Sequence, residues 1–224
     1  MRLILTLCAL VSAAFAQDAP KPAATQALSK VVLLGDSVRE GYAPFVAELL
    51  AGRATVLTPK ANGRDTGTLL TNLDEWAVQE KPEVVHFNCG IHDTKQNKES
   101  GKNNVAPDQY EANLREFVKR LRAETKAKLV FALSTPLMDE RSQEAWKTRS
   151  YRLINASITE YNQIALRVMK ELDVPVNDLP AALGTEAEVA RLHDAGGIHF
   201  TKEGSQKLAA TVVSFVTPYL PTRP

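Results

Sequence analysis

Short, largely apolar runs alternate with longer segments of helical periodicity, and this alternation constrains the fold of the chain most. Apolar runs of this length are typical of strands that are covered on both faces. We expect strands at 31–34, 54–57, 84–88, 129–134 and 174–176. Apolar residues at three-four spacing predict helices at about 39–51, 107–124, 154–172 and 201–219, and another around 69–76. The pattern predicts an α/β protein with a five-stranded parallel sheet and helices on both faces, a three-layer α/β/α arrangement.

The N-terminal segment has the features of an export signal. Arg2 precedes an apolar stretch at 3–11, and Ala14-Phe15-Ala16 fits the small-x-small rule for cleavage before Gln17. We therefore expect a signal peptide at 1–16, a flexible leader at 17–29 that contains two prolines, and a single domain at 30–224. The expected location is exported, either periplasmic or secreted.

Charge and cysteine content exclude two classes of protein. A formal net charge of +1 over 224 residues gives no basic field for binding nucleic acid. Cleavage at residue 16 would leave Cys89 as the only cysteine, so the mature chain would have no internal disulfide. Cys89 falls at the end of an expected buried strand, which favours an inert core thiol over a nucleophile.

The first strand ends in Gly35-Asp36-Ser37. Open parallel sheets keep their ligand sites at the carboxyl ends of the strands, so Ser37 is a candidate nucleophile with a turn amide nearby. The alternative is a turn followed by a helix cap, which the same residue types favour. After the second strand, Gly63 would let a backbone amide approach a substrate oxygen, although an ordinary turn glycine fits equally.

Two histidine-containing loops follow later strands. Gly90-Ile91-His92-Asp93 comes after the third strand and is expected beside the first. There Asp93 would accept backbone N–H bonds, and His92 would donate toward a reacting oxygen or be an exposed loop histidine. His199 precedes the last helix and is the candidate general base toward Ser37. His86 alternates with apolar residues, which favours a core or sheet-end histidine.

These motifs, in this order, resemble the blocks of the SGNH, or GDSL-type, hydrolases, and the resemblance spans about 30–220. The stretch 88–93 looks like a bacterial, exported branch of that family. The resemblance implies a flavodoxin-like fold and ester hydrolysis through an acyl-serine, with no metal and no cofactor. It implies Ser37 as nucleophile and His199 as base, with the amides of Ser37 and Gly63 in the oxyanion hole.

The same resemblance assigns supporting places in the site to Asp36, Asn88 and Asp93. His92 stands where the family usually has an asparagine that completes the oxyanion hole. A neutral imidazole has one N–H to donate, so His92 substitutes if its tautomer is right.

A second departure from the family concerns the partner of the base. Gly196 stands where the family usually has an aspartate, three residues before the catalytic histidine. Asp194 is the candidate replacement that would orient His199. The alternatives are a backbone carbonyl in that role and a surface position for Asp194.

The sequence as a whole favours an exported serine esterase that hydrolyses small acyl esters, acetyl above all, on carbohydrate. The loops at 94–106 and 136–150 would rim the pocket, where Trp146 would stack on a sugar or belong to the core. One alternative is an inactive relative that binds glycan or a partner, and another is a lysophospholipase or thioesterase. The expected partner is a small-molecule or carbohydrate ester, not nucleic acid or membrane, and oligomeric state is not indicated. A zinc site would draw on dispersed residues without tight ligand spacing: His92, Asp93, His193 and His199.

Overall fold

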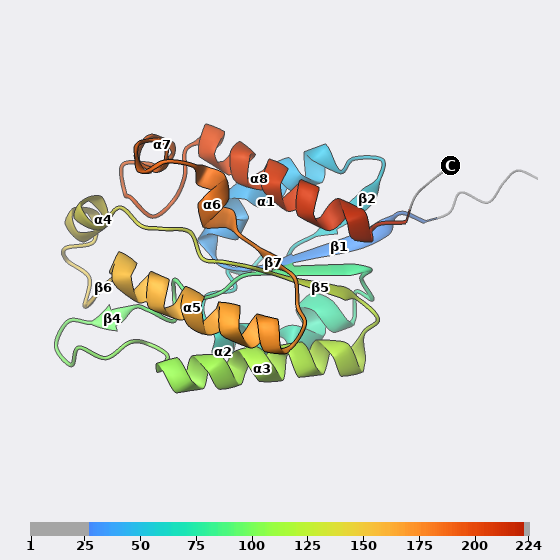
Figure 1. Cartoon of the computed structure of the whole chain (residues 1–224), viewed down its shortest axis with the longest axis horizontal. Coiled ribbons are helices and arrows are strands. Elements are labelled where there is room, and N and C mark those ends of the chain that lie inside the picture. Colours follow the sequence, from blue (N-terminus) through green and yellow to red (C-terminus); the bar gives the residue numbers. More distant parts are fainter. Residues whose placement is uncertain (1–26, 222–224) are drawn as a thin grey trace, which may run out of the picture.

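A computed structural model describes residues 27–221, and its centre is a five-stranded parallel sheet (Figure 1). The strand order is β2-β1-β3-β5-β7. The strands are β1 (Ser29–Leu34), β2 (Ala54–Leu57), β3 (Val84–Phe87), β5 (Lys128–Ala132) and β7 (Val176–Asn177). β1 and β3 are neighbours and the strand order reverses around β1, so the loops that follow these two strands meet at one edge of the sheet, as expected.

Helices cover both faces of the sheet, which confirms the three-layer fold (Figure 1). Successive residues of β1 point to opposite faces and divide the interior into two apolar clusters. Val31 and Leu33 pack with residues of α1 (Ser37–Leu49), α6 (Leu179–Leu183) and α8 (Lys202–Val216). On the other face, Val32 and Leu34 pack with residues of α2 (Thr66–Thr71), α3 (Pro107–Glu124) and α5 (Asn155–Glu171).

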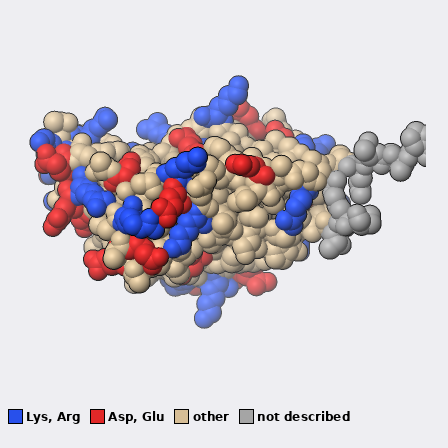
Figure 2. Space-filling view, turned by 90° about the horizontal axis from the view of Figure 1, so that it is seen from above, with Lys and Arg blue, Asp and Glu red and all other residues tan. Residues whose placement is uncertain are grey.

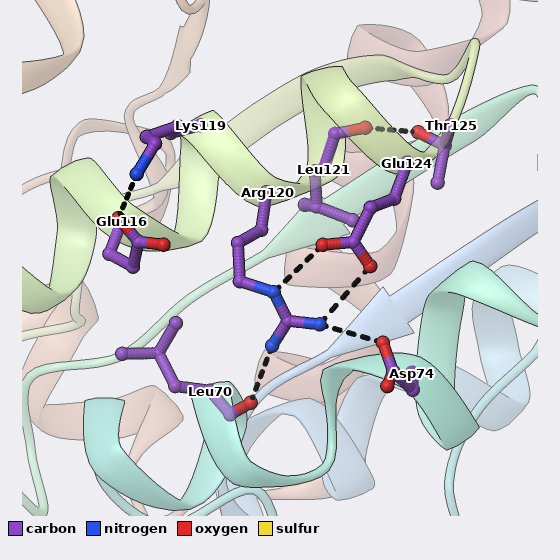
Figure 3. A network of polar contacts seen from close by, with 8 residues as sticks. All are labelled: Leu70, Asp74, Glu116, Lys119, Arg120, Leu121, Glu124 and Thr125. Carbon is purple, nitrogen blue, oxygen red and sulfur yellow. Dashed lines mark hydrogen bonds and ion pairs between the residues drawn. The ribbon is translucent and has the colours of Figure 1, made fainter.

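Ion pairs on the surface attach α3 to the elements beside it (Figure 3). Arg120 of α3 donates to Glu124, to Asp74 of the π-helical turn η1 (Asp74–Val78) and to the Leu70 carbonyl of α2. Lys119 pairs with Glu116 one turn away on the same helix. Such exposed pairs contribute about 1 kcal/mol or less each, so the apolar clusters carry most of the stability.

The expected loops at 94–106 and 136–150 contain regular structure. β4 (Gln96–Asn97) pairs antiparallel with β6 (Tyr151–Arg152), and α4 (Asp139–Ala145) lies within the second loop. Two-residue strands are too short to show a period in the sequence. The short helices α6 and α7 (Glu186–Leu192) and the 3-10 turn η2 (Thr217–Tyr219) were likewise not predicted as separate elements.

Several expected boundaries differ from the structure by a few residues. α1 begins at Ser37 rather than 39, because the Asp36 side chain caps it. The last strand is 176–177 rather than 174–176. The expected signal peptide at 1–16 and leader residues 17–26 lie outside the described residues, and Ser29, expected in the leader, belongs to β1. Within 27–221 we find no helix of the length and apolar character needed to cross a bilayer.

Candidate active site

Ser37 and His199 meet at the carboxyl edge of the sheet. The His199 Nε2 atom lies 2.7 Å from the Ser37 Oγ atom, although the residues are 162 positions apart in the chain. Ser37 is the first residue of α1, and His199 lies in the loop between α7 and α8. A hydroxyl at hydrogen-bond distance from an imidazole nitrogen is the arrangement of an activated nucleophile and its base.

Asp36 fixes the turn that presents Ser37. Its Oδ1 atom accepts the Val38 N–H at 3.0 Å, which caps α1, and the carboxyl group is fully buried. Burial raises the pKa of Asp36, while the Val38 N–H and the neighbouring Asn88 amide act in the opposite direction. Asp36 therefore fixes the nucleophile turn by capping α1, and Asn88 is buried as well; their supporting places in the site stay predictions.

Arg39, which sequence reasoning did not single out, ties the nucleophile turn to the loop after β2. Its buried guanidinium donates to the carbonyls of Gly35, Pro59 and Ala61 at 3.1–3.3 Å. The signal in the sequence is an arginine within the apolar stripe of α1 two residues after the nucleophile. A cation on the buried face of a helix requires acceptors, which here are backbone carbonyls.

Gly63 allows the close approach of these two loops. Its N–H donates to the Gly35 carbonyl at 2.9 Å, and a Cβ atom on Gly63 would lie 2.5 Å from that oxygen. The Gly63 amide is thus not free to bind an oxyanion in this structure, contrary to expectation. Its physical role is to let one backbone contact another, which is a common requirement for glycine.

His92 is held in one tautomer by Lys95. The Lys95 Nζ atom lies 3.0 Å from the His92 Nδ1 atom. Because an ammonium group only donates, Nδ1 must be the acceptor, and the neutral ring carries its hydrogen on Nε2. Burial, followed by the charge of Lys95, lowers the pKa of His92 to about 4, so the ring is neutral at physiological pH. His92 therefore meets the requirement set by the sequence: a neutral imidazole with one defined N–H donor.

Asp93 braces the loop that carries His92. Its Oδ1 atom accepts the backbone N–H of Thr66 at 3.0 Å and the Thr66 hydroxyl at 2.6 Å. Burial raises the pKa of Asp93 to about 6. The predicted brace is confirmed, and it connects the loop after β3 to the first residue of α2.

Asp194 lies near His199 but outside hydrogen-bond distance. The Asp194 Oδ2 atom is 3.9 Å from the His199 Nδ1 atom. The other oxygen, Oδ1, accepts the backbone N–H groups of Gly196 and Gly197 at 2.9 and 3.0 Å. Asp194 therefore shapes the loop that carries His199, and it faces the imidazole as a charge rather than as a bonded partner.

The remaining candidate residues are buried or pack against other parts of the structure. His86 is fully buried in β3, its Nε2 atom lies 3.2 Å from the Asn177 amide, and burial lowers its pKa to about 3. Cys89 is buried, which raises the pKa of its thiol. Both ring nitrogens of His193 contact backbone carbonyls. Trp146 is partly buried against the core and contacts Tyr151 edge to face, and both predicted roles for it stay open.

Among residues 27–221, no group of three or more histidine, cysteine or acidic residues is placed to hold a metal ion.

Comparison with known proteins identifies the family of the chain. Residues 33–207 match the GDSL-like lipase/acylhydrolase family. The chain belongs to this family. The chain is similar to the isoamyl acetate-hydrolyzing esterase 1 homolog of Rattus norvegicus, with 24% identity over 193 residues, or 80% of this chain and 78% of the relative. It is also similar to the GDSL esterase/lipase WDL1 of rice (Oryza sativa subsp. japonica), with 24% identity over 78% of this chain and 72% of the relative.

Solved structures share the fold of this chain. A lipase/acylhydrolase from Enterococcus faecalis superimposes with a TM-score of 0.73 at 21% identity, covering 88% of this chain and all of the other. The acetyl xylan esterase AlAXEase superimposes with a TM-score of 0.67 at 17% identity, covering 84% of this chain and 99% of the other. The family assignment makes ester hydrolysis the expected activity, and relatives in mammals and rice show that the similarity is not confined to bacteria.

Proposed function

We propose that this protein is an exported serine esterase that removes small acyl groups, acetyl above all, from carbohydrate. The observation that carries the proposal is the 2.7 Å contact between the Ser37 hydroxyl and the His199 imidazole. This contact supports the proposal because the proposed nucleophile and base lie together at the sheet edge where ligands bind in this class of fold.

In the proposed reaction, the Ser37 oxygen attacks the ester carbonyl carbon while its proton passes to His199 Nε2. The tetrahedral intermediate collapses, the C–O bond to the alcohol breaks, and His199 returns the proton to the departing alcohol. Water then attacks the acyl-serine with His199 again as base. The products are the free acid and the original Ser37 hydroxyl.

Two N–H groups support an oxyanion hole. The Ser37 amide is among the first N–H groups of α1, which have no acceptor within the helix. The second donor is His92 Nε2–H, which the contact with Lys95 holds in the required tautomer. A donor aimed at the developing oxyanion lowers the barrier by about 3 kcal/mol in other acyl-transfer enzymes.

The substrate and location in this proposal have separate support. Solved relatives of the same fold include an acetyl xylan esterase, and the rat relative is named for hydrolysis of isoamyl acetate. Both names refer to acetyl esters. Export is supported by the pattern of residues 1–16.

The test is hydrolysis of p-nitrophenyl acetate and acetylated xylo-oligosaccharide by the purified protein. We expect Ser37→Ala to lower kcat at least 10³-fold, since a serine nucleophile has no substitute in this mechanism. The matched control is Ser214→Ala, which changes an exposed serine of α8 and should retain full activity. Equal rates in the wild type and Ser37→Ala would overturn the proposal.

A second candidate function is glycan binding without turnover. The observation that favours it is the 3.9 Å separation between Asp194 and His199, which leaves the base without a hydrogen-bonded carboxylate. A fluorophosphonate probe separates the two candidates, because it labels only an activated serine. Labelling of the wild type at Ser37 would exclude an inert site, and no labelling would favour the binding function.

A further inference from the structure

A polar cavity of about 410 Å³ lies beside the candidate oxyanion donor, with His92 in its wall. Three cationic side chains line it, from Arg64, Lys95 and Lys102, against a single carboxylate, Asp65. Arg64 directly follows Gly63, so the cavity adjoins the loop that contacts the nucleophile turn.

The carboxylate in the cavity wall is already engaged. Asp65 Oδ1 accepts from the Thr68 backbone and hydroxyl at 2.9 and 3.0 Å, and Oδ2 accepts from the Asn104 amide at 3.0 Å. Within residues 27–221, neither Arg64 nor Lys102 has an acidic side chain at ion-pair distance. The cavity therefore has more positive charge than its own carboxylate balances.

Two segments on the cavity side of the molecule are also rich in basic residues. Residues 94–106, which contain β4, have three lysines and one glutamate. Residues 146–152, which contain β6, have three basic residues, of which Lys147 pairs with Glu144 of α4. The whole chain has a formal net charge of only +1. On the face seen in Figure 2, by contrast, acidic and basic side chains are intermixed. Basic residues thus outnumber acidic ones in the two segments that contain β4 and β6.

The other lining groups match a ligand rich in hydroxyls. The wall contains amide and hydroxyl side chains of Asn97, Ser100, Asn103, Asn104 and Ser150. The Asn103 Oδ1 atom is buried and has no hydrogen-bond partner among the described residues, which leaves an acceptor unused. The Tyr151 ring also lines the cavity, but the Lys95 Nζ atom lies 4.9 Å from the ring centroid. That face of the ring is therefore not open for stacking a nucleobase.

From this combination we infer that the cavity binds the alcohol portion of the substrate, and that this portion is a sugar with a carboxylate or sulfate group. The inference rests on the proposed function and narrows its substrate class to acyl esters of acidic carbohydrates. Arg64 and Lys102 supply the free charges, and the amides and hydroxyls of the wall pair with the sugar hydroxyls.

The test compares acetylated methyl glucoside with acetylated methyl glucuronoside and with the 6-sulfate of the glucoside. We expect kcat/KM to be at least tenfold higher for both acidic substrates at low salt, and the ratio to fall toward one in 0.5 M NaCl as the charges are screened. A preference for only one acidic substrate would identify which group the cavity accepts. Equal kcat/KM for all three substrates would overturn the inference.

Variants locate the effect in the cavity. Arg64→Gln and Lys102→Gln should each lower the acidic-to-neutral ratio several-fold, while Lys119→Gln should leave it unchanged. Lys119 is a suitable control because it is an exposed lysine of α3, with 76% of its side chain accessible, and pairs with Glu116 only. An unchanged ratio in both cavity variants would also contradict the inference.

Binding of methyl glucuronoside to Ser37→Ala, measured by calorimetry beside methyl glucoside, separates this inference from the proposed function. Tighter binding of the acidic sugar without any turnover by the wild type would refute the esterase function and keep the acidic-sugar site. Turnover of esters without any preference for acidic sugars would refute the site and keep the esterase.

Discussion

Two aspartates next to the reacting groups have opposite surroundings. Asp36 precedes the nucleophile, is fully buried and caps α1. Asp194 precedes the base by five residues, is 40% exposed and holds its own loop. The nucleophile turn is therefore fixed by buried groups from several elements, whereas the base depends on a short surface loop. The difference indicates that the position of Ser37 is fixed more firmly than the position of His199.

The largest expected effect comes from a substitution among the buried groups that fix the nucleophile turn. Arg39→Met removes the guanidinium that bonds the carbonyls of Gly35, Pro59 and Ala61. Bonds from a charged donor to buried acceptors are worth about 1.5–3 kcal/mol, so we expect the free energy of unfolding to fall by about 3 kcal/mol or more. Chemical denaturation followed by circular dichroism measures this change.

A surface arginine with a similar number of hydrogen bonds is the control. Arg120 on α3 is partly exposed and bonds Glu124, Asp74 and the Leu70 carbonyl (Figure 3). Arg120→Met should lower the free energy of unfolding by about 1 kcal/mol or less, because water screens these bonds. Similar losses in the two variants would contradict the view that burial gives Arg39 its importance.

A second prediction uses the buried carboxyl group of Asp93, which, like Asp36, fixes a loop of the site from the interior. Burial raises the pKa of Asp93 to about 6, from 3.8 in the unfolded chain. Between these values the native state binds the proton more tightly, so the Asp93 contribution to stability decreases as pH rises from 4 to 6, by about 3 kcal/mol.

Asp93→Asn tests this pH dependence. The amide oxygen still accepts from Thr66 but does not titrate, so the variant should lack this fall in the free energy of unfolding. The measurement is denaturant unfolding of the wild type and the variant from pH 4 to pH 7, with the difference isolating the carboxyl group. Parallel curves for the two proteins would show that Asp93 does not titrate in this range.

The smallest effect is expected on the histidine side. Asp194→Asn removes the charge facing His199 but keeps an oxygen for the amides of Gly196 and Gly197. Two charges about 4 Å apart in water interact by about 1 kcal/mol, so kcat should fall about fivefold. Loss of the bonded aspartate of a serine protease lowers turnover about 10⁴-fold. A loss of that size here would mean that Asp194 bonds His199 during turnover.

The parts of the site predicted from sequence are those with a strong local signal. An apolar run followed by Gly35-Asp36-Ser37 predicted the end of the first strand, and the expected parallel sheet brought His199 toward Ser37. In the structure the two side chains are 2.7 Å apart. The brace by Asp93 followed from the same reasoning. These inferences needed only the periodicity of strands and helices and the rule that parallel strands end at one edge.

Other features depend on contacts between distant segments. The Gly63 amide was expected to face substrate, but it meets the Gly35 carbonyl because Arg39 draws both loops together. The bond from Lys95 to His92 depends on side-chain rotamers within one loop. The two-residue ladder of β4 and β6 has no readable period. Each of these is decided by packing in three dimensions, for which a single sequence has no local signal.

The direction of the first strand and the last helix has a practical consequence. β1 starts at the amino edge of the sheet and ends at Leu34, three residues before Ser37, whereas α8 starts three residues after His199 and runs back toward the amino edge (Figure 1). Both ends of the described chain therefore emerge on the side away from the reacting groups. A resin, an affinity tag or a fused carrier joined at either end would leave the catalytic edge facing open solution.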